Sequence, residues 1–173
     1  MKFAWIVLLA GAATLAGQPF TSPAANATAT IGGATIKIDY NAPSMHGRKI
    51  IGGLVPYGKV WRAGANKATL LHTDADLTIG DVAVPKGDYS LYVLVDQTQW
   101  TLIINKKTGQ WGINHDGTTT EDPALDLGRA KMELSKGGPI ETFNISVKET
   151  GAKTGKLQME WENTIATVPI TVK

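Results

Sequence analysis

Hydrophobic and polar residues alternate along much of the chain with the two-residue period of a β-strand. Three segments place their apolar residues on one face only: Ile36, Ile38 and Tyr40; Phe143, Ile145 and Val147; and Leu157, Met159 and Trp161. Because successive side chains of a strand point to opposite faces, this alternation predicts strands with one buried face. Residues 89–95 and 100–104 are apolar on both faces, and we expect them to form a central hairpin that is covered on both sides.

Short turn sequences rich in Gly, Asp and Pro separate the predicted strands. They lie at residues 32–33, 80–81, 85–88, 96–99 and 106–109. After the apolar N-terminal run, no segment has the period and length of an amphipathic helix. Nine or ten short strands joined by such turns predict an all-β protein, an antiparallel β-sandwich, with a partly open barrel as the second choice.

The N-terminus has the features of a secretory signal peptide. Lys2 precedes an apolar run of 14 residues from Phe3 to Ala16, which is shorter than the roughly 18–20 residues that span a bilayer. We therefore assign residues 1–17 to a signal peptide, 18–26 to a flexible lead-in and 27–173 to a single β-sandwich domain. This organisation predicts a secreted or periplasmic protein with no membrane span after signal cleavage.

Composition excludes several classes of protein. The chain has 173 residues and no Cys, which rules out a disulfide scaffold and a lipid anchor on cysteine. Its 17 Lys and Arg against 15 Asp and Glu give a formal charge of +2. A nucleic-acid partner or a polybasic membrane tail would require a large excess of positive charge, so we expect neither.

One segment departs from this balanced pattern. Residues 40–73 contain five Lys and Arg side chains and no acidic residue, and residues 41–66 form a long irregular connection rich in Gly. Connections of this length in a compact domain are usually functional or disordered. Disorder is disfavoured because the connection also contains apolar residues that can fold down onto the sandwich: Ile50, Ile51, Leu54, Val55, Tyr57, Val60 and Trp61.

The residue types of this segment suit the recognition of an anionic or glycan-like ligand. Arg48 and Arg62 could donate charge-assisted hydrogen bonds to carboxylate, sulfate or phosphate oxygens, and Trp61 offers a stacking face. Asn66 and His72 would add neutral polar contacts. A sugar with acidic substituents fits this set, so the first hypothesis is an exported binding module that presents residues 41–66 to such a ligand.

Two alternatives remain open. The cationic segment could instead pair with residues 74–99, which contain one Lys and five acidic residues: Asp74, Asp76, Asp81, Asp88 and Asp96. Such surface pairs contribute about 0–1 kcal/mol each and would indicate solubility and strand register only. The protein would then be a structural or interaction domain of the cell envelope without a small-molecule site.

The weaker alternative is a hydrolase or isomerase that uses Asp39 with a histidine. The chain contains three histidines, His46, His72 and His115, and their spacing matches no common metal-binding motif. A calcium loop at residues 114–126 lacks the order of acidic residues found in an EF-hand. No catalytic residue, metal ligand or cofactor is predicted from these patterns.

Several motifs resemble a bacterial family called domain of unknown function 2911. They are GRKI at residues 47–50, GGLVPYGKVWRAGAN at 52–66, PKGDYSL at 85–91, the run from Asn105 to Gly112, DLGR at 126–129, and the C-terminal end from Trp161 to Ile170. The resemblance covers about residues 22–170 and implies an exported β-sandwich with no established reaction. It singles out Arg48, Trp61, Arg62, Gly64 and Asn66 without giving them a role. Lys67 stands where the resemblance implies Glu, which removes a potential carboxylate partner for Arg48 or Arg62.

Overall fold

The computed structural model describes residues 21–173, so the predicted signal peptide and the first residues of the predicted lead-in lie outside it. The described chain contains ten β-strands, one 3-10 turn (Pro123–Leu125) and no α-helix, hence no helix that could cross a membrane. The strands are β1 (Ala24–Ile31), β2 (Ala34–Asn41), β3 (Lys59–Trp61), β4 (Thr69–Thr73), β5 (Leu77–Ile79), β6 (Val82–Val84), β7 (Gly87–Val95), β8 (Trp100–Asn105), β9 (Asp126–Gly151) and β10 (Thr154–Val172).

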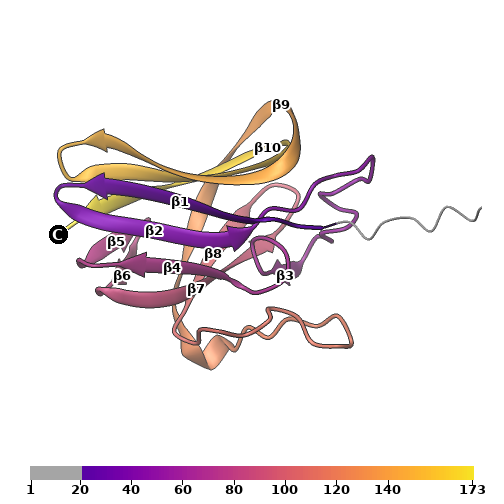
Figure 1. Cartoon of the computed structure of the whole chain (residues 1–173), viewed down its shortest axis with the longest axis horizontal. Coiled ribbons are helices and arrows are strands. Elements are labelled where there is room, and N and C mark those ends of the chain that lie inside the picture. The colour runs from indigo at the N-terminus through magenta and orange to yellow at the C-terminus, as the bar shows by residue number, and fades with distance from the viewer. Residues whose placement is uncertain (1–20) are drawn as a thin grey trace, which may run out of the picture.

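Antiparallel hydrogen bonds join the strands in the order β1-β2-β4-β7-β8-β9-β10-β5-β6, and β3 adds to β7. The first part of β9 pairs with β8 and the second part pairs with β10, so this long strand passes from one layer to the other. In Figure 1 the hairpin of β9 and β10 lies over β1, with which it is in contact. The sheet is therefore folded over on itself as a β-sandwich and is not closed into a barrel, which confirms the first choice of fold.

The alternating segments form the strands predicted for them. Their apolar residues are buried in β2, β9 and β10, while residues 89–95 and 100–104 pair as the β7–β8 hairpin. Trp100 and Trp161 are 2% and 1% exposed, so both indoles belong to the core. Tyr92, on the opposite face of β7 from the core, is also fully buried because the connection between β8 and β9 covers it. The expectation that this hairpin is covered on both sides is confirmed.

Three boundaries differ from the sequence-based expectation. β1 begins at Ala24, inside the predicted flexible lead-in, because its backbone groups pair with β2 whatever side chains it carries. Residues 41–66 include the short strand β3, which pairs with the C-terminal end of β7. β9 continues for 26 residues through Gly137, Gly138 and Pro139. Pairing between residues that are distant in sequence sets all three boundaries. The turn residues near each boundary do not indicate this pairing.

Candidate functional site

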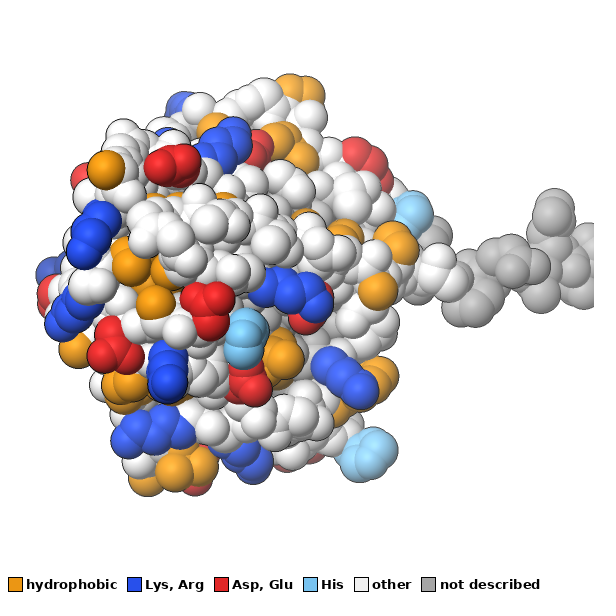
Figure 2. Space-filling view, turned by 60° about the vertical axis from the view of Figure 1, so that its left-hand side comes forward, with side chains coloured by type: hydrophobic (Ala, Val, Ile, Leu, Met, Phe, Trp, Pro, Cys, Tyr) orange, Lys and Arg blue, Asp and Glu red, His pale blue; other side chains and the backbone are white. Residues whose placement is uncertain are grey.

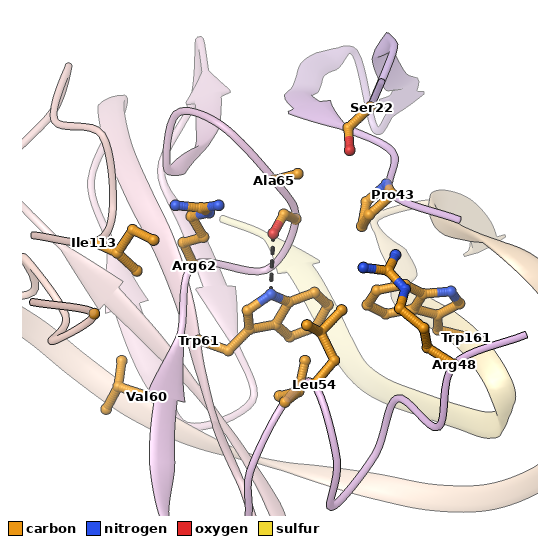
Figure 3. A pocket seen from close by; sticks show the side chains of 13 residues that line it. Ser22, Pro43, Arg48, Leu54, Val60, Trp61, Arg62, Ala65, Ile113 and Trp161 are labelled. Atoms are coloured by element: carbon orange, nitrogen blue, oxygen red, sulfur yellow. Dashed lines mark hydrogen bonds between the residues drawn. The ribbon is translucent and has the colours of Figure 1, made fainter. Parts of the chain in front are cut away.

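A cleft of about 370 Å³ lies where three connections meet: the loop between β2 and β3, the turn after β3 and the loop between β8 and β9. Its lining includes Arg48, Trp61 and Arg62, three of the five residues predicted to bind a ligand. Figure 3 shows the guanidinium groups of Arg48 and Arg62 on opposite sides of the Trp61 ring. Leu54 and Ile113, which are 50% and 36% exposed, add apolar surface to the same cleft.

Stacked aromatic rings hold Trp61 in place. Trp61 lies over the buried Trp161 of β10 with ring centroids 5.7 Å apart and an interplanar angle of 23°. Phe143 of β9 packs edge-on against the Trp61 ring, with ring centroids 4.8 Å apart. The Trp61 Nε1 donates to the Gly64 carbonyl at 3.0 Å. Trp61 is therefore a fixed, half-buried wall of the cleft, and only part of its surface can face a ligand.

The turn after β3 has a constrained backbone. Ala63, Gly64 and Asn66 have φ values of +52°, +155° and +59°. A Cβ on Gly64 would lie 2.9 Å from the Asn41 carbonyl oxygen, so this position requires glycine. The Asn66 Nδ2 donates to the Ser22 carbonyl at 3.4 Å, and Asn66 is not part of the cleft lining. It braces the turn against the N-terminal segment.

The loop between β2 and β3 is packed onto the sandwich. Ile50, Ile51 and Val55 are buried, as the apolar pattern predicts, whereas Leu54 and Tyr57 are exposed, contrary to that prediction. The Glu162 carboxylate of β10 accepts hydrogen bonds from the backbone N–H groups of Ile50 and Ile51 at 3.4 and 3.1 Å. This contact between residues more than 100 positions apart fixes the loop, and no local sequence signal indicates it.

The two arginines of the cleft are held differently. The Arg48 guanidinium donates to the carbonyls of Met45 and Ser44 at 2.9 and 2.7 Å, which ties it to its own loop. The Arg62 Nη1 is buried and has no hydrogen-bond partner within residues 21–173. Burial lowers the pKa of Arg62 below its usual value, and nearby Tyr92 opposes this shift. Arg62 therefore retains an unused donor in a desolvated position.

His72 lies elsewhere on the sheet. Its Nδ1 is 2.6 Å from the Asp88 carboxylate on the neighbouring strand β7, and both side chains are about half exposed. Within residues 21–173 this is the one ion pair that joins the cationic segment to residues 74–99. Three of the remaining acids accept backbone N–H groups: Asp74 from Thr35, Asp76 from Lys86 and Asp96 from Gln97.

The surface charges form no large single-sign field on the face seen in Figure 2, where cationic and anionic side chains are interspersed. The neutralisation alternative thus applies to His72, while Arg62 has no such carboxylate contact among the described residues. The polar character of the cleft therefore comes from a few individual side chains, among them Arg48 and Arg62.

The other residues considered for catalysis or metal binding do not form a common site among residues 21–173. Asp39 pairs with Lys37 at 2.8 Å, while the His46 backbone N–H donates to Glu141 and His115 lies in an exposed turn. Across residues 21–173 no three His, Cys, Asp or Glu side chains gather as a metal site would require. Lys67 lines a separate hollow with Asp39 and does not face the cleft of Arg48 and Arg62.

Sequence patterns did not reveal a second arginine cluster at the start of β9. The Arg129 Nη2 is 2.8 Å from Glu121 and its Nε donates to Asp126 at 2.7 Å. The Glu121 side chain is only 3% exposed. Burial, reinforced by the hydrogen bond and the negative charge of Asp126, raises the pKa of Glu121 above its usual value, and Arg129 only partly offsets this.

The fold and the cleft define an all-β sandwich whose loops enclose an arginine- and tryptophan-lined hollow. The chain belongs to the family described as "Protein of unknown function (DUF2911)", whose model matches residues 22–170. No curated protein and no solved structure matches the chain. Four of the five positions singled out by the motif line the cleft, namely Arg48, Trp61, Arg62 and Gly64, and the fifth, Asn66, braces its turn.

Proposed function

We propose that this protein is an exported binding module that holds the anionic group of a small molecule or glycan in the cleft of Arg48, Trp61 and Arg62. The observation that carries the proposal is the buried Nη1 of Arg62, which has no partner within residues 21–173. A desolvated charge is costly unless it is paired and hydrogen-bonded. A ligand carboxylate, sulfate or phosphate would supply both the opposite charge and the acceptor.

The three residues would contribute in different ways. Arg62, which lines the cleft, would donate to the anion after a rotation of its guanidinium exposes Nη1, the nitrogen that has no partner within residues 21–173. Arg48, held in place by its hydrogen bonds to the carbonyls of Met45 and Ser44, would add positive potential from the opposite side of the cleft. Trp61, fixed against Trp161, would present a rigid apolar wall at low entropic cost. Asn66 supports the turn, and His72 has no part in this proposal.

Export is the second part of the proposal. The family match begins at residue 22, directly after the predicted signal peptide and the first residues of the lead-in. A chain without cysteine is compatible with the oxidising conditions of the periplasm or the cell exterior. Expression with an epitope tag at the C-terminus, followed by cell fractionation and mass determination of the mature N-terminus, tests this part directly.

The binding test uses Arg62→Met, which removes the charge and keeps an unbranched apolar side chain. Its matched control is Lys59→Met, which removes an exposed cation from β3. Titration with galacturonate, sulfate, phosphate and acetate, followed by calorimetry, should show at least one anion that binds the wild type. Because a charge-assisted hydrogen bond contributes about 1.5–3 kcal/mol, Arg62→Met should weaken that binding at least tenfold.

Lys59→Met should retain the wild-type affinity, and added salt should weaken binding to the wild type. The proposal is wrong if every anion that binds does so equally well to Arg62→Met, or if none binds the wild type. A cleft without affinity for anions would favour the structural or interaction domain of the cell envelope.

A further inference from the structure

An exposed tryptophan lies next to the cleft. Trp111 is 53% exposed, more than any other large hydrophobic residue described. With Ile113, Asn114 and His115 it lines a hollow of about 360 Å³. Ile113 also lines the cleft that contains Arg62, so the two hollows adjoin at this side chain. The hollow at Trp111 therefore borders the cleft at the Ile113 side chain.

The loop that presents Trp111 is anchored on both sides. The Gln110 Nε2 donates to the Tyr92 hydroxyl at 2.8 Å, and the Thr120 N–H donates to the Gly112 carbonyl at 3.1 Å. The Thr120 hydroxyl also lies 3.2 Å from the Tyr92 hydroxyl. Tyr92 is fully buried in β7, so these contacts attach the loop to the face of the sheet opposite to the core. The exposed indole is held by a fixed backbone on a tethered loop.

The same loop connects Trp111 to Arg62. Gly112 has a φ of +95°, and a Cβ at this position would lie 2.7 Å from the Cβ and Cδ of Arg62. The backbone of residue 112 thus lies directly on the Arg62 side chain, one residue from Trp111. A ligand longer than one sugar ring could therefore extend from Arg62 past Ile113 into the hollow at Trp111.

We infer that the ligand is an acidic oligosaccharide, with its anionic group at Arg62 and an adjoining sugar ring on the face of Trp111. This inference rests on the proposed function and extends it. A rigid tryptophan supplies a large contact area at low entropic cost, and the apolar face of a sugar ring fits such a surface. The exposed Asn114 and His115 lie beside the indole and can hydrogen-bond to sugar hydroxyls.

The test compares ligands of different length and charge on the purified protein. The probes are galacturonic acid, tri-galacturonate, a chondroitin sulfate hexasaccharide and the neutral cellotriose. The variants are Trp111→Ala, Arg62→Met and, as a matched control, Leu125→Ala, which removes another exposed apolar side chain from the same connection. Affinities are measured by calorimetry, and tryptophan fluorescence reports on the indole environment.

We expect an acidic oligosaccharide to bind more tightly than galacturonic acid and far more tightly than cellotriose. Trp111→Ala should weaken the oligosaccharide roughly tenfold, as expected for loss of one aromatic contact, and leave the monosaccharide unchanged. Arg62→Met should weaken both at least tenfold, and Leu125→Ala should weaken neither.

Different failures lead to different conclusions. If Arg62→Met loses oligosaccharide binding and Trp111→Ala does not, the inference about Trp111 is overturned and the anion site stands. If simple anions bind through Arg62 and no acidic oligosaccharide does, or if cellotriose binds as tightly as the acidic probes, the assignment of the ligand class is overturned. If nothing binds in a manner that depends on Arg62, the proposed function itself fails.

Discussion

Two arginines of this protein occupy contrasting environments. Arg129, at the start of β9, contacts the carboxylates of Glu121 and Asp126 at 2.8 and 2.7 Å. Arg62, at the end of β3, has a buried Nη1 without a hydrogen-bond partner within residues 21–173. Both contact the connection from β8 to β9: Arg129 binds Glu121 near one end of it, and the Arg62 side chain packs against Gly112.

The difference separates a structural charge from one that is available to a ligand. The Nε and Nη2 of Arg129 are used by Asp126 and Glu121, and Asp126 is held in turn by the Asn105 side chain at 2.8 Å. Arg62 is desolvated without that compensation, which is unfavourable for the fold alone. A charge kept in such a position is a candidate for recognition, whereas a fully compensated charge is a candidate for stability.

The largest expected effect is the loss of stability in Arg129→Met. Removing the cation leaves the carboxylates of Glu121 and Asp126 close together, one almost fully buried and the other 11% exposed. Breaking a buried pair usually costs 3–5 kcal/mol; because Arg129 is 37% exposed, we expect about 2–3 kcal/mol at pH 7. Urea unfolding measures this change, and an unaltered midpoint would show that the cluster adds no stability.

Gly112→Ala should come next. The substitution imposes a side chain at a φ of +95° and brings its Cβ to 2.7 Å from the Arg62 side chain. We expect a loss of about 1–3 kcal/mol together with weaker anion binding. Gly109→Ala is the matched control, because Gly109 has a φ of +83° and open space around it. If both variants lose equal stability and neither affects binding, the contact between residue 112 and Arg62 is unimportant.

The pH dependence of stability should reveal the interaction between the carboxyl groups of Glu121 and Asp126. The folded state raises the pKa of Glu121 above its reference value of 4.5, so the folded protein binds this proton more tightly than the unfolded chain. That contribution is complete below the unfolded pKa and is lost as the pH rises through the folded pKa. Lowered pKa values of Asp74 and Asp116 act in the opposite sense at more acidic pH.

Glu121→Gln isolates this contribution. Relative to the wild type, its unfolding free energy should increase between pH 4 and pH 7, because glutamine carries no charge to desolvate. Thermal melts across this range measure the difference between the two proteins. A difference that is independent of pH would mean that Glu121 titrates alike in the folded and unfolded states.

The smallest expected effect on stability belongs to Arg62→Met. Removing a desolvated cation that has no carboxylate partner among the described residues should change the free energy of unfolding by no more than about 1 kcal/mol, in either direction. The same substitution at Arg129 should cost more than twice as much. If Arg62→Met unfolds as readily as Arg129→Met, the two arginines have the same structural role and the contrast fails.

Sequence alone determined the strands and much of the core. The two-residue alternation predicted one buried face for each of β2, β9 and β10, and the apolar runs predicted β7 and β8. Both patterns are local properties of the chain, and the folded structure contains the strands that they predict. The unusual composition of residues 41–66 also predicted Arg48, Trp61 and Arg62 as ligand-binding residues, and these three side chains line one cleft. Asn66 and His72 satisfied the same chemical criteria and lie outside its lining.

Tertiary structure decided which groups meet across long stretches of chain. The stacking of Trp61 on Trp161, the contact of Glu162 with the loop after β2, and the position of Gly112 on Arg62 all depend on the order of strands in the sheet. Alternation along a strand specifies its buried face and leaves its neighbours undetermined. For that reason the sequence identified the cationic residues, and only the folded sandwich distinguished Arg129, with its two carboxylates, from Arg62, which has none within residues 21–173.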